Sequence, residues 1–353
     1  MEKTITRIKD IAEKAQVSTG TVDRVLHNRG RVSEEVRQRV LQIAKEMNYE
    51  PNLLARALVT NRTYTIAALI PDPAADSYWQ APKTGIEKAE TELKQYGVVV
   101  KQFIFDPFHA ASFRENADKL TNSIFDAILV APIFYRESLT YFNVWKKKGV
   151  PFVLFNTHIP DYEPLMYIGQ DSYLSGYLAG KIFHFGHQES GTFLVAHIDE
   201  NMQDSSHLVK KEQGFSDYFQ QNTSPASYNI IHTQLNRGAD KEAFAAQLDK
   251  LLTGNAGIKG IFVTNSKSYM VAEYLQERGH KKINLVGYDL VEKNLHFLNA
   301  GVINFLINQN PKGQGYHSIY GLADHLIFKK KVEPIKYLPL DIITKENLQY
   351  YYG

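Results

Sequence analysis

The stretch VSTGTVDRVLHNRGRVS (residues 17–33) combines a short helical repeat with an unusual polar side. Val22, Val25 and Leu26 recur at helical spacing, while the opposite side carries small hydroxyl groups and arginine. A solvated surface helix would explain such a pattern in an isolated segment. The flanking sequence favours a different interpretation.

Helical patterns lie on both sides of this stretch. Apolar residues at helical spacing precede it at Ile8, Ile11, Ala12 and Ala15 and follow it at Val36, Val40, Ile43 and Met47. Ser18 and Ser33 stand where a second and a third helix need caps. Three short helices within residues 1–50 predict a helix-turn-helix unit.

The second helix of this unit keeps one side open once its apolar side packs inward. That side holds Thr19, Gly20, Asp23, Arg24 and His27. Short polar groups let a helix enter the major groove of DNA, and arginine can form two hydrogen bonds to guanine. A three-helix bundle that binds a protein is the alternative, and the pattern favours nucleic acid.

The segment from Ile8 to Thr63 resembles the DNA-binding head of the lactose-repressor (LacI/GalR) family of bacterial transcription regulators. The motifs that carry the resemblance are Thr21-Val22, Arg24-Val25, Arg31-Val32-Ser33, Tyr49-Glu50-Pro51-Asn52 and Ala55-Arg56-Ala57-Leu58. It implies base contacts from Thr19, Gly20 and Arg24, and phosphate contacts from Ser18, Thr21 and Asn28. Gly20 and Asp23 depart from familiar members. Asp23 would accept from a cytosine amino group or orient Arg24, so the operator sequence cannot be copied from relatives.

Residues 51–62 follow the head as a hinge. The resemblance implies that this segment becomes helical on operator DNA, beside its twin from a second subunit, with Ala55 and Leu58 at the minor groove. Leu58 would wedge between the central base pairs. Two such leucines require a two-fold dimer and a palindromic operator. A plain linker is the alternative for free protein, because helices below about 12 residues are marginal in water.

From residue 63 to residue 353 the chain alternates between strand-like and helix-like segments. The strand candidates are residues 65–70, 98–105, 127–132, 151–156, 191–198, 227–234, 260–265, 283–289 and 302–309. This alternation predicts an α/β body of parallel, doubly wound sheets in two lobes, with a ligand cleft at the carboxyl ends of the strands. The resemblance implies the same architecture: a periplasmic-binding-protein-like body whose lobes are joined by three crossings.

Polar and aromatic residues near strand ends are the candidate effector contacts. They are Tyr78, Trp79, Asp171, Lys211, Asn265, Asp289 and Gln309. A carboxylate can accept two sugar hydroxyls, and an amide can donate and accept. The aromatic pair resembles one that sandwiches a sugar ring, and we expect it in the cleft because two adjacent aromatics cannot both face one core. Helix capping is the alternative for Asp171, Asn265, Asp289 and Gln309.

Two positions of the body also depart from the family pattern. Lys211 stands where many members have arginine, and Ser266 replaces the aspartate that usually follows Asn265. Both change the polar lining, so the expected effector is sugar-like without a specific identity. Arg136 and His158 lie on loops after strands, where they either meet a charged ligand group or are solvated.

The composition argues against several other classes of protein. The 353 residues carry a net charge of +2. The sequence contains no cysteine, which excludes disulfides and thiolate metal sites and favours an intracellular protein. No apolar run reaches the roughly 18 residues of a membrane helix. Gly313-Gln314-Gly315 lacks the spacing of a phosphate loop, and His184 and His187 have no evident metal-binding partner. We expect no catalytic residue, cofactor or metal.

The sequence therefore predicts a cytoplasmic, nucleoid-associated transcriptional regulator, acting as a repressor. Residues 1–50 bind DNA, residues 51–62 form the hinge, and residues 63–353 bind the effector and dimerise. A sugar-like effector would shift a two-state equilibrium and so change operator affinity. The C-terminus lacks a leucine heptad, which favours a homodimer over a tetramer. A sugar-binding transport protein is the alternative, and the missing export signal and the DNA-binding head argue against it.

Overall fold

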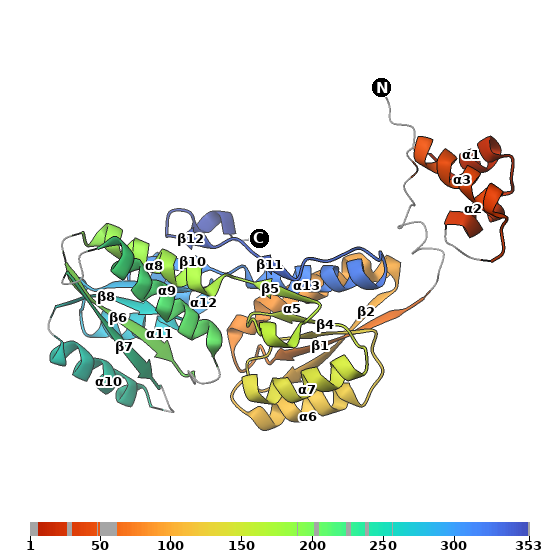
Figure 1. Ribbon diagram of the computed structural model, residues 1–353. Helices are drawn as coiled ribbons and strands as arrows, with labels where there is room; N and C mark the ends of the chain where they lie inside the picture. The colour runs from red at the N-terminus through yellow and green to blue at the C-terminus, as the bar shows by residue number, and fades with distance from the viewer. Residues whose placement is uncertain are drawn as a thin grey trace. The chain divides into compact units, whose positions relative to one another are not determined.

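The computed structural model describes residues 6–26, 30–47, 49, 62–188, 190–200, 205–223, 227–236, 240–255 and 257–351. These residues form two compact units, one ending at Tyr49 and the other beginning at Arg62. Figure 1 labels the helices and strands of both units. None of the described helices combines the length and apolarity that a bilayer crossing requires.

The first unit consists of three helices, as the sequence predicts: α1 (Ile8–Ala15), α2 (Thr19–Leu26) and α3 (Glu34–Glu46). Its core is formed by Ile11, Ala12, Ala15, Val22, Val25, Val40 and Ala44. Gln16 ends α1 in the left-handed region, at φ 54°, which makes the tight turn before α2. Ser18 Oγ accepts a hydrogen bond from Thr21 N at 3.1 Å and so caps α2. Ser33 occupies the cap position of α3, but its side chain makes no capping bond.

The second unit contains two six-stranded sheets. The first has the order β11-β5-β4-β3-β1-β2, from β1 (Tyr64–Pro71), β2 (Val98–Phe105), β3 (Ala127–Val130), β4 (Phe152–Phe155), β5 (Met166–Gly169) and β11 (Ile335–Tyr337). The second has the order β12-β10-β9-β8-β6-β7, from β6 (Gly191–Ile198), β7 (Tyr228–Leu235), β8 (Ile258–Val263), β9 (Asn284–Tyr288), β10 (Phe305–Asn308) and β12 (Asp341–Ile343). The described pairs are parallel apart from the antiparallel pair of β10 and β12.

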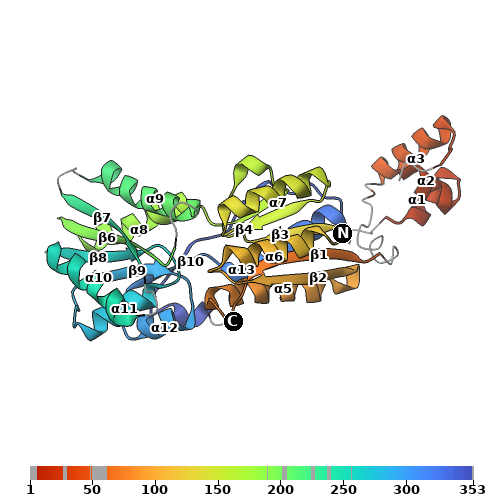
Figure 2. The ribbon, with the colours of Figure 1, turned by 90° about the horizontal axis from the view of Figure 1, so that it is seen from below.

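Helices cover both faces of each sheet, which makes two lobes (Figure 2). In the first lobe, α5 (Gln80–Leu93) and α13 (Pro311–Leu326) cover one face, and α6 (Ala110–Thr121) and α7 (Tyr135–Lys147) cover the other. In the second lobe, α8 (Ser172–Gly186) and α9 (Ser206–Asn222) lie opposite α10 (Lys241–Gly254), α11 (Ser268–Glu277) and α12 (Glu292–Asn299). This confirms the expected two-lobed α/β body.

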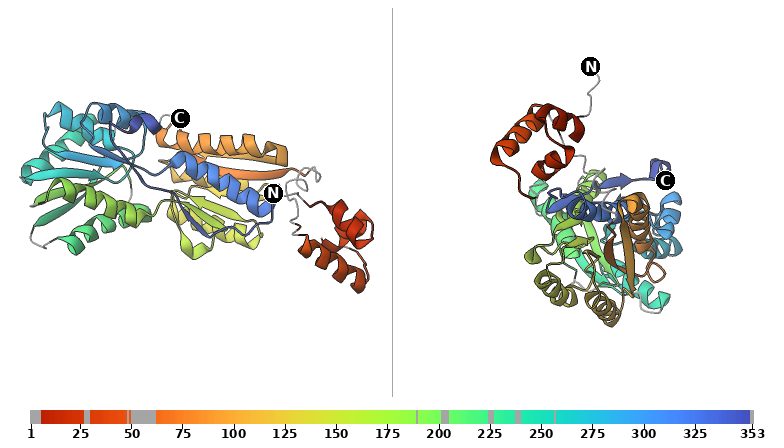
Figure 3. Two further views of the ribbon diagram at one scale, coloured as in Figure 1. Left: turned by 90° about the horizontal axis from the view of Figure 1, so that it is seen from above. Right: turned by 90° about the vertical axis from the view of Figure 1, so that its right-hand side faces the viewer.

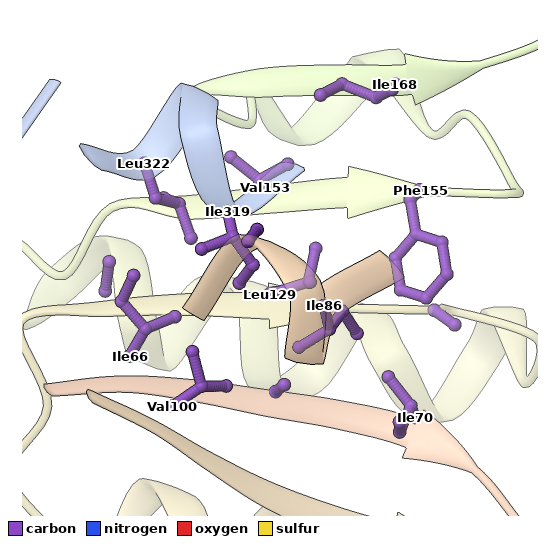
Figure 4. Close-up of a cluster of buried hydrophobic side chains, with 14 of the residues drawn as sticks. Ile66, Ile70, Ile86, Val100, Leu129, Val153, Phe155, Ile168, Ile319 and Leu322 are labelled. Atoms are coloured by element: carbon purple, nitrogen blue, oxygen red, sulfur yellow. The ribbon is translucent and has the colours of Figure 1, made fainter. Parts of the chain in front are cut away.

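Alternate residues of the central strands face opposite layers of helices. On β1, Ile66 and Ile70 point toward α5 and α13, while Leu69 belongs to the core under α6 and α7. Figure 4 shows Ile86 and Ile319 from the two covering helices meeting side chains of the strands. Strands buried on both faces explain why the sequence shows nearly continuous apolar runs here.

The chain passes between the lobes three times: after β5, after β10 and after β11. The sequence analysis missed β5 and β11, and it began β10 at residue 302 instead of at Phe305. The missed strands have four and three residues, so neither is long enough to show a periodic pattern.

Glycines let two pairs of helices approach at backbone distance. A Cβ atom on Gly176 of α8 would lie 1.8 Å from Lys211 O, and one on Gly214 of α9 would lie 2.0 Å from Tyr173 O. In the first lobe, Gly85 of α5 and Gly315 of α13 allow an equally close approach, since a Cβ on either would lie within 2.2 Å of a backbone oxygen of the other helix. The two helices, orange and blue, lie side by side in Figure 3. The crossing of α8 and α9 therefore places Lys211 in the interior.

Candidate functional site

The first unit presents the polar side of α2 to solvent. Ser18, Thr19, Gly20 and Arg24 are exposed, and Thr21 and Asp23 are half-buried. Because Val22 and Val25 occupy the core, the residues that the sequence analysis assigned to DNA share the outward side of α2. Asn28 of the same set, and Ala55 and Leu58 of the hinge, lie outside the described residues.

Arg24 is held along this side by contacts within its own helix. Its Nε donates to Gly20 O at 3.1 Å, and an η-nitrogen donates to Thr21 Oγ1 at 3.3 Å. Thr21 Oγ1 in turn lies 2.9 Å from Ser18 Oγ. A guanidinium held in this way loses less conformational freedom when it binds a partner.

The second unit contains a cavity of about 170 Å³ between its lobes. Its lining residues are Asp76, Tyr78, Trp79, Pro107, Phe108, Ile133, Phe134, Asn156, Asp199, Glu200, Ser205, His207, Lys211, Asn265, Ser266, Lys267, Asp289 and Gln309. Sites for drug-sized ligands run from about 300 Å³ upward, so this cavity suits a smaller molecule. Six of the seven predicted effector residues line it; Asp171 does not.

Several lining residues adopt a left-handed backbone where a strand ends. Asn156 after β4, Asp199 after β6 and Asp289 after β9 have φ values of 67°, 52° and 63°. Asparagine and aspartate tolerate this region better than other residues with a Cβ. The turn at each strand end thus brings a short polar side chain to the cavity.

The aromatic wall differs from the expected arrangement. Tyr78 and Trp79 lie in η1 (Ser77–Trp79), are 6% and 5% exposed, and belong to the same core cluster while lining the cavity. Their rings meet edge to face at 4.9 Å and 90°. The argument that adjacent aromatics cannot share a core was wrong, because the tight turn of η1 brings both rings to one side. Perpendicular rings in contact cannot sandwich a sugar between them.

Asp289, Gln309 and Lys211 form one hydrogen-bonded group at the floor of the cavity. The two oxygens of Asp289 accept from Gln309 N, at 3.1 Å, and from Gln309 Nε2. Lys211 Nζ donates to Gln309 Oε1 at 3.3 Å and to Thr264 O at 2.8 Å, and lies 3.6 Å from the centre of the Tyr288 ring. The capping alternative for Asp289 was wrong, since Val291 is the cap residue of α12.

Asn265 uses its amide within the protein. Its Nδ2 donates to Ile198 O at 2.8 Å and to Glu200 Oε1 at 2.9 Å, and its Oδ1 accepts from Lys267 N at 3.2 Å. The amide of Gln309 is likewise bonded at both ends. These two residues therefore orient the charged groups around them, and the carboxylates keep lone pairs for a ligand.

Burial changes the ionisation of three groups at the cavity. It raises the pKa of Asp289 to about 6, lowers the pKa of Lys211 to about 8, and lowers the pKa of His207 to about 4. At neutral pH, Asp289 and Lys211 are therefore mostly charged and His207 is neutral. His207 Nδ1 lies 3.4 Å from Thr157 Oγ1, which joins the second lobe to the first.

Asp171 lies apart from the other predicted effector residues. Its carboxylate accepts from Leu174 N at 3.0 Å and caps α8, which was the alternative in the sequence analysis. It lines a second cavity of about 200 Å³ together with His158. Arg136 lines neither of these two cavities.

Comparison with known proteins gives a consistent assignment for both units. The family described as bacterial regulatory proteins, lacI family, matches residues 7–52, and the periplasmic binding protein domain matches residues 66–330. A crystal structure assigned as a LacI transcriptional regulator from Bacteroides fragilis shares 31% identity and a TM-score of 0.75. The alignment covers 82% of this chain and 100% of that one. The chain belongs to the LacI family of bacterial regulatory proteins.

Two further relatives give weaker evidence: the first matches only a small part of this LacI-family chain, and the second shows only that the fold is shared. The HTH-type transcriptional regulator MalR of Streptococcus pneumoniae is 45% identical over 75 residues, which are 21% of this chain and 23% of MalR. The chain thus matches less than a quarter of the length of this curated relative. GanP, a glucose-galactose binding protein from Geobacillus stearothermophilus, has 19% identity, covers 82% of this chain and 99% of its own, and has a TM-score of 0.72.

The cavity contains the two positions of the body that depart from the LacI-family pattern. Lys211 and Ser266 line it, so each replacement changes the chemistry that a ligand meets. A lysine offers a point charge where arginine would offer a planar fork of donors. The missing aspartate at Ser266 removes one negative charge from the lining.

The sequence analysis did not identify several of the residues that line the cavity. They are Asp76, Phe108, Phe134, Asn156, Asp199, Glu200, Ser205, His207 and Lys267. For Asn156 and Asp199 a signal existed, because each is an asparagine or aspartate directly after a buried strand. The loop and helix residues gave no comparable signal, since only the approach of the two lobes makes them neighbours.

Proposed function

We propose that the protein is a transcriptional repressor that binds a palindromic operator as a homodimer in the bacterial cytoplasm and is controlled by a small sugar-like effector. One observation carries the proposal: a LacI-family helix-turn-helix head and a two-lobed body with a polar interlobe cavity occur in a single chain. The head would bind the operator, and the body would sense the effector.

In this proposal Thr19, Gly20 and Arg24 read bases, while Ser18, Thr21 and Asn28 contact the backbone of the DNA. Asp23 accepts from a base amino group or orients Arg24. Ala55 and Leu58 of the hinge contact the minor groove. The exposure of the outward side of α2 supports the base-reading role.

The effector would act by bonding to both lobes at once. Asp76 and Trp79 come from the first lobe, and Asp289 and Lys211 come from the second. A ligand that contacts both sets stabilises the conformation in which they face each other. A tenfold preference for one conformation supplies about 1.4 kcal/mol of bias.

An electrophoretic mobility shift with DNA from upstream of the protein's own gene tests the proposal. We expect a retarded complex that weakens as salt rises and that responds to one sugar of a panel. Absence of a shift at every salt concentration, together with sugar binding by calorimetry, would instead support a sugar-binding protein without a regulatory role.

The pKa of Asp289 predicts a pH dependence of effector binding. A sugar hydroxyl donates to the ionised carboxylate, and this acceptor is lost as pH falls through about 6, where Asp289 takes up a proton. We therefore expect affinity for a neutral sugar to be full at pH 7.5 and to decline toward pH 5. Calorimetry across this range measures the effect.

The matched variant is Asp289→Asn, which keeps the shape but does not titrate. Its affinity should be lower at pH 7.5, and the decline between pH 7 and pH 5.5 should be shallower than in the unaltered protein. An identical pH profile in both proteins would show that another group controls the decline.

A further inference from the structure

The cavity carries an excess of negative charge. Among the described lining residues four are carboxylates, Asp76, Asp199, Glu200 and Asp289, and two are lysines, Lys211 and Lys267. His207 adds no positive charge at neutral pH, because burial lowers its pKa to about 4. The electrostatic environment therefore disfavours an anionic ligand.

Both lysines are already engaged by groups of the protein. Lys211 bonds to Thr264 O and Gln309 Oε1. Lys267 Nζ donates to Ile198 O at 3.4 Å, lies 3.9 Å from Asp199 and stands 5.6 Å from the centre of the Phe108 ring. A phosphate or carboxylate on a ligand would have to compete with these contacts.

The carboxylates face each other from the two lobes. Asp76 precedes η1 in the first lobe, where Oδ1 accepts from Tyr78 N at 3.0 Å. Among the described residues, Lys267 is the cation whose charge acts on this carboxylate. Burial is the largest cause that raises the pKa of Asp76; the hydrogen bond from Tyr78 N and the charge of Lys267 lower it, and the charge of Glu200 raises it. The charge of Asp76 in turn contributes to the raised pKa of Asp289. Asp76 of the first lobe thus lies close enough to the second lobe to interact with its carboxylates and with Lys267.

We propose, resting on the proposed function, that the effector carries no phosphate or carboxylate and that an ammonium group between Asp76 and the carboxylates of the second lobe strengthens its binding. Such a cation would bond to carboxylates of both lobes at once, so it favours the conformation in which they face each other. The aromatic rings of Trp79, Phe108 and Phe134 add a surface that attracts cations. Arg136 and His158, which could have met an anionic group, lie outside this cavity.

The test is titration calorimetry at pH 7 with a panel of hexoses and pentoses. Each sugar is measured in four forms: the neutral parent, the amino sugar, the uronic acid and the sugar phosphate. Trp79 provides a second readout by fluorescence, since it is one of two tryptophans and the other, Trp145, is buried in a different cluster. We expect the amino form of the best sugar to bind more tightly than its parent by roughly three- to tenfold. The anionic forms should bind at least about tenfold more weakly than the parent.

Asp76→Asn is the decisive variant, because asparagine caps a helix as well as aspartate does and only the charge is lost. It should bring the ratio of amino-sugar to parent-sugar affinity toward one. Asp72→Asn removes a charge on the same loop, from a residue outside the cavity lining, and should leave the ratio unchanged. If an anionic form binds most tightly, or if Asp76→Asn leaves the ratio of amino-sugar to parent-sugar affinity unaltered, the inference is wrong while the proposed function stands. Failure of every sugar to bind counts against the proposed function as well.

Discussion

Replacing Gly176 with alanine is expected to lower the free energy of unfolding of the two-lobed unit by about 1–3 kcal/mol, the usual cost of overpacking a tight interior. The new Cβ would lie 1.8 Å from Lys211 O and within 2.9 Å of two further backbone atoms of that residue. Backbone cannot rotate away as a flexible side chain can, so α8 and α9 must separate. The gain in helix propensity, about 1 kcal/mol, offsets only part of this cost.

The same change should weaken effector binding, because moving α9 displaces Lys211 from Thr264 and Gln309. Thermal unfolding followed by circular dichroism measures the stability, and calorimetry measures the binding. Gly186→Ala is the control: it lies on the same helix and a Cβ there meets nothing within 4 Å. Equal melting temperatures for the two variants would show that α8 and α9 do not pack as closely as described.

Replacing Arg24 with alanine is expected to remove most of the preference for one base pair of the operator while leaving weak, salt-dependent binding to any duplex. A guanidinium that bonds one base edge contributes about 1–3 kcal/mol of discrimination, which is roughly a five- to 150-fold change in affinity. Arg24 is suited to this role because Gly20 O and Thr21 Oγ1 hold it along the exposed side of α2.

Fluorescence anisotropy on an operator selected from random duplexes, and on a scrambled duplex of equal length, measures this discrimination. Arg39→Ala is the matched control, since it removes the same charge from an exposed position on α3. It should lower both affinities by a similar factor. Unchanged discrimination in Arg24→Ala would remove Arg24 from the base-reading set.

Much of the fold follows from local patterns in the sequence. Serine precedes the second and third helices of the head as a favoured capping residue, at Ser18 and Ser33, and the apolar repeats of the three helices are regular. The long central strands are apolar runs bounded by polar turns. The short strand β5 and the exposed strand β11 escaped prediction, because pairing with each other and with β4 defines them, and neither has a pattern of its own.

The candidate site was predictable where its residues directly follow a recognisable strand. Asp289, Asn265 and Gln309 follow strands in the sequence, and parallel strands bring their carboxyl ends to one edge. Which of their atoms are available to a ligand was not predictable, since Gln309 bonds to both Lys211 and Asp289. Asp76 and His207 belong to different lobes, and no local pattern indicates that two distant segments will meet.

The left-handed strand ends at Asn156, Asp199 and Asp289 limit how this cavity can evolve. Most side chains strain the backbone at such angles, so exchange at these positions is restricted largely to asparagine, aspartate and glycine. We therefore expect the descendants of this protein to acquire new ligand preferences mainly through neighbouring residues in ordinary backbone conformations. A comparison of orthologues that respond to different ligands should find these three positions the slowest to diversify.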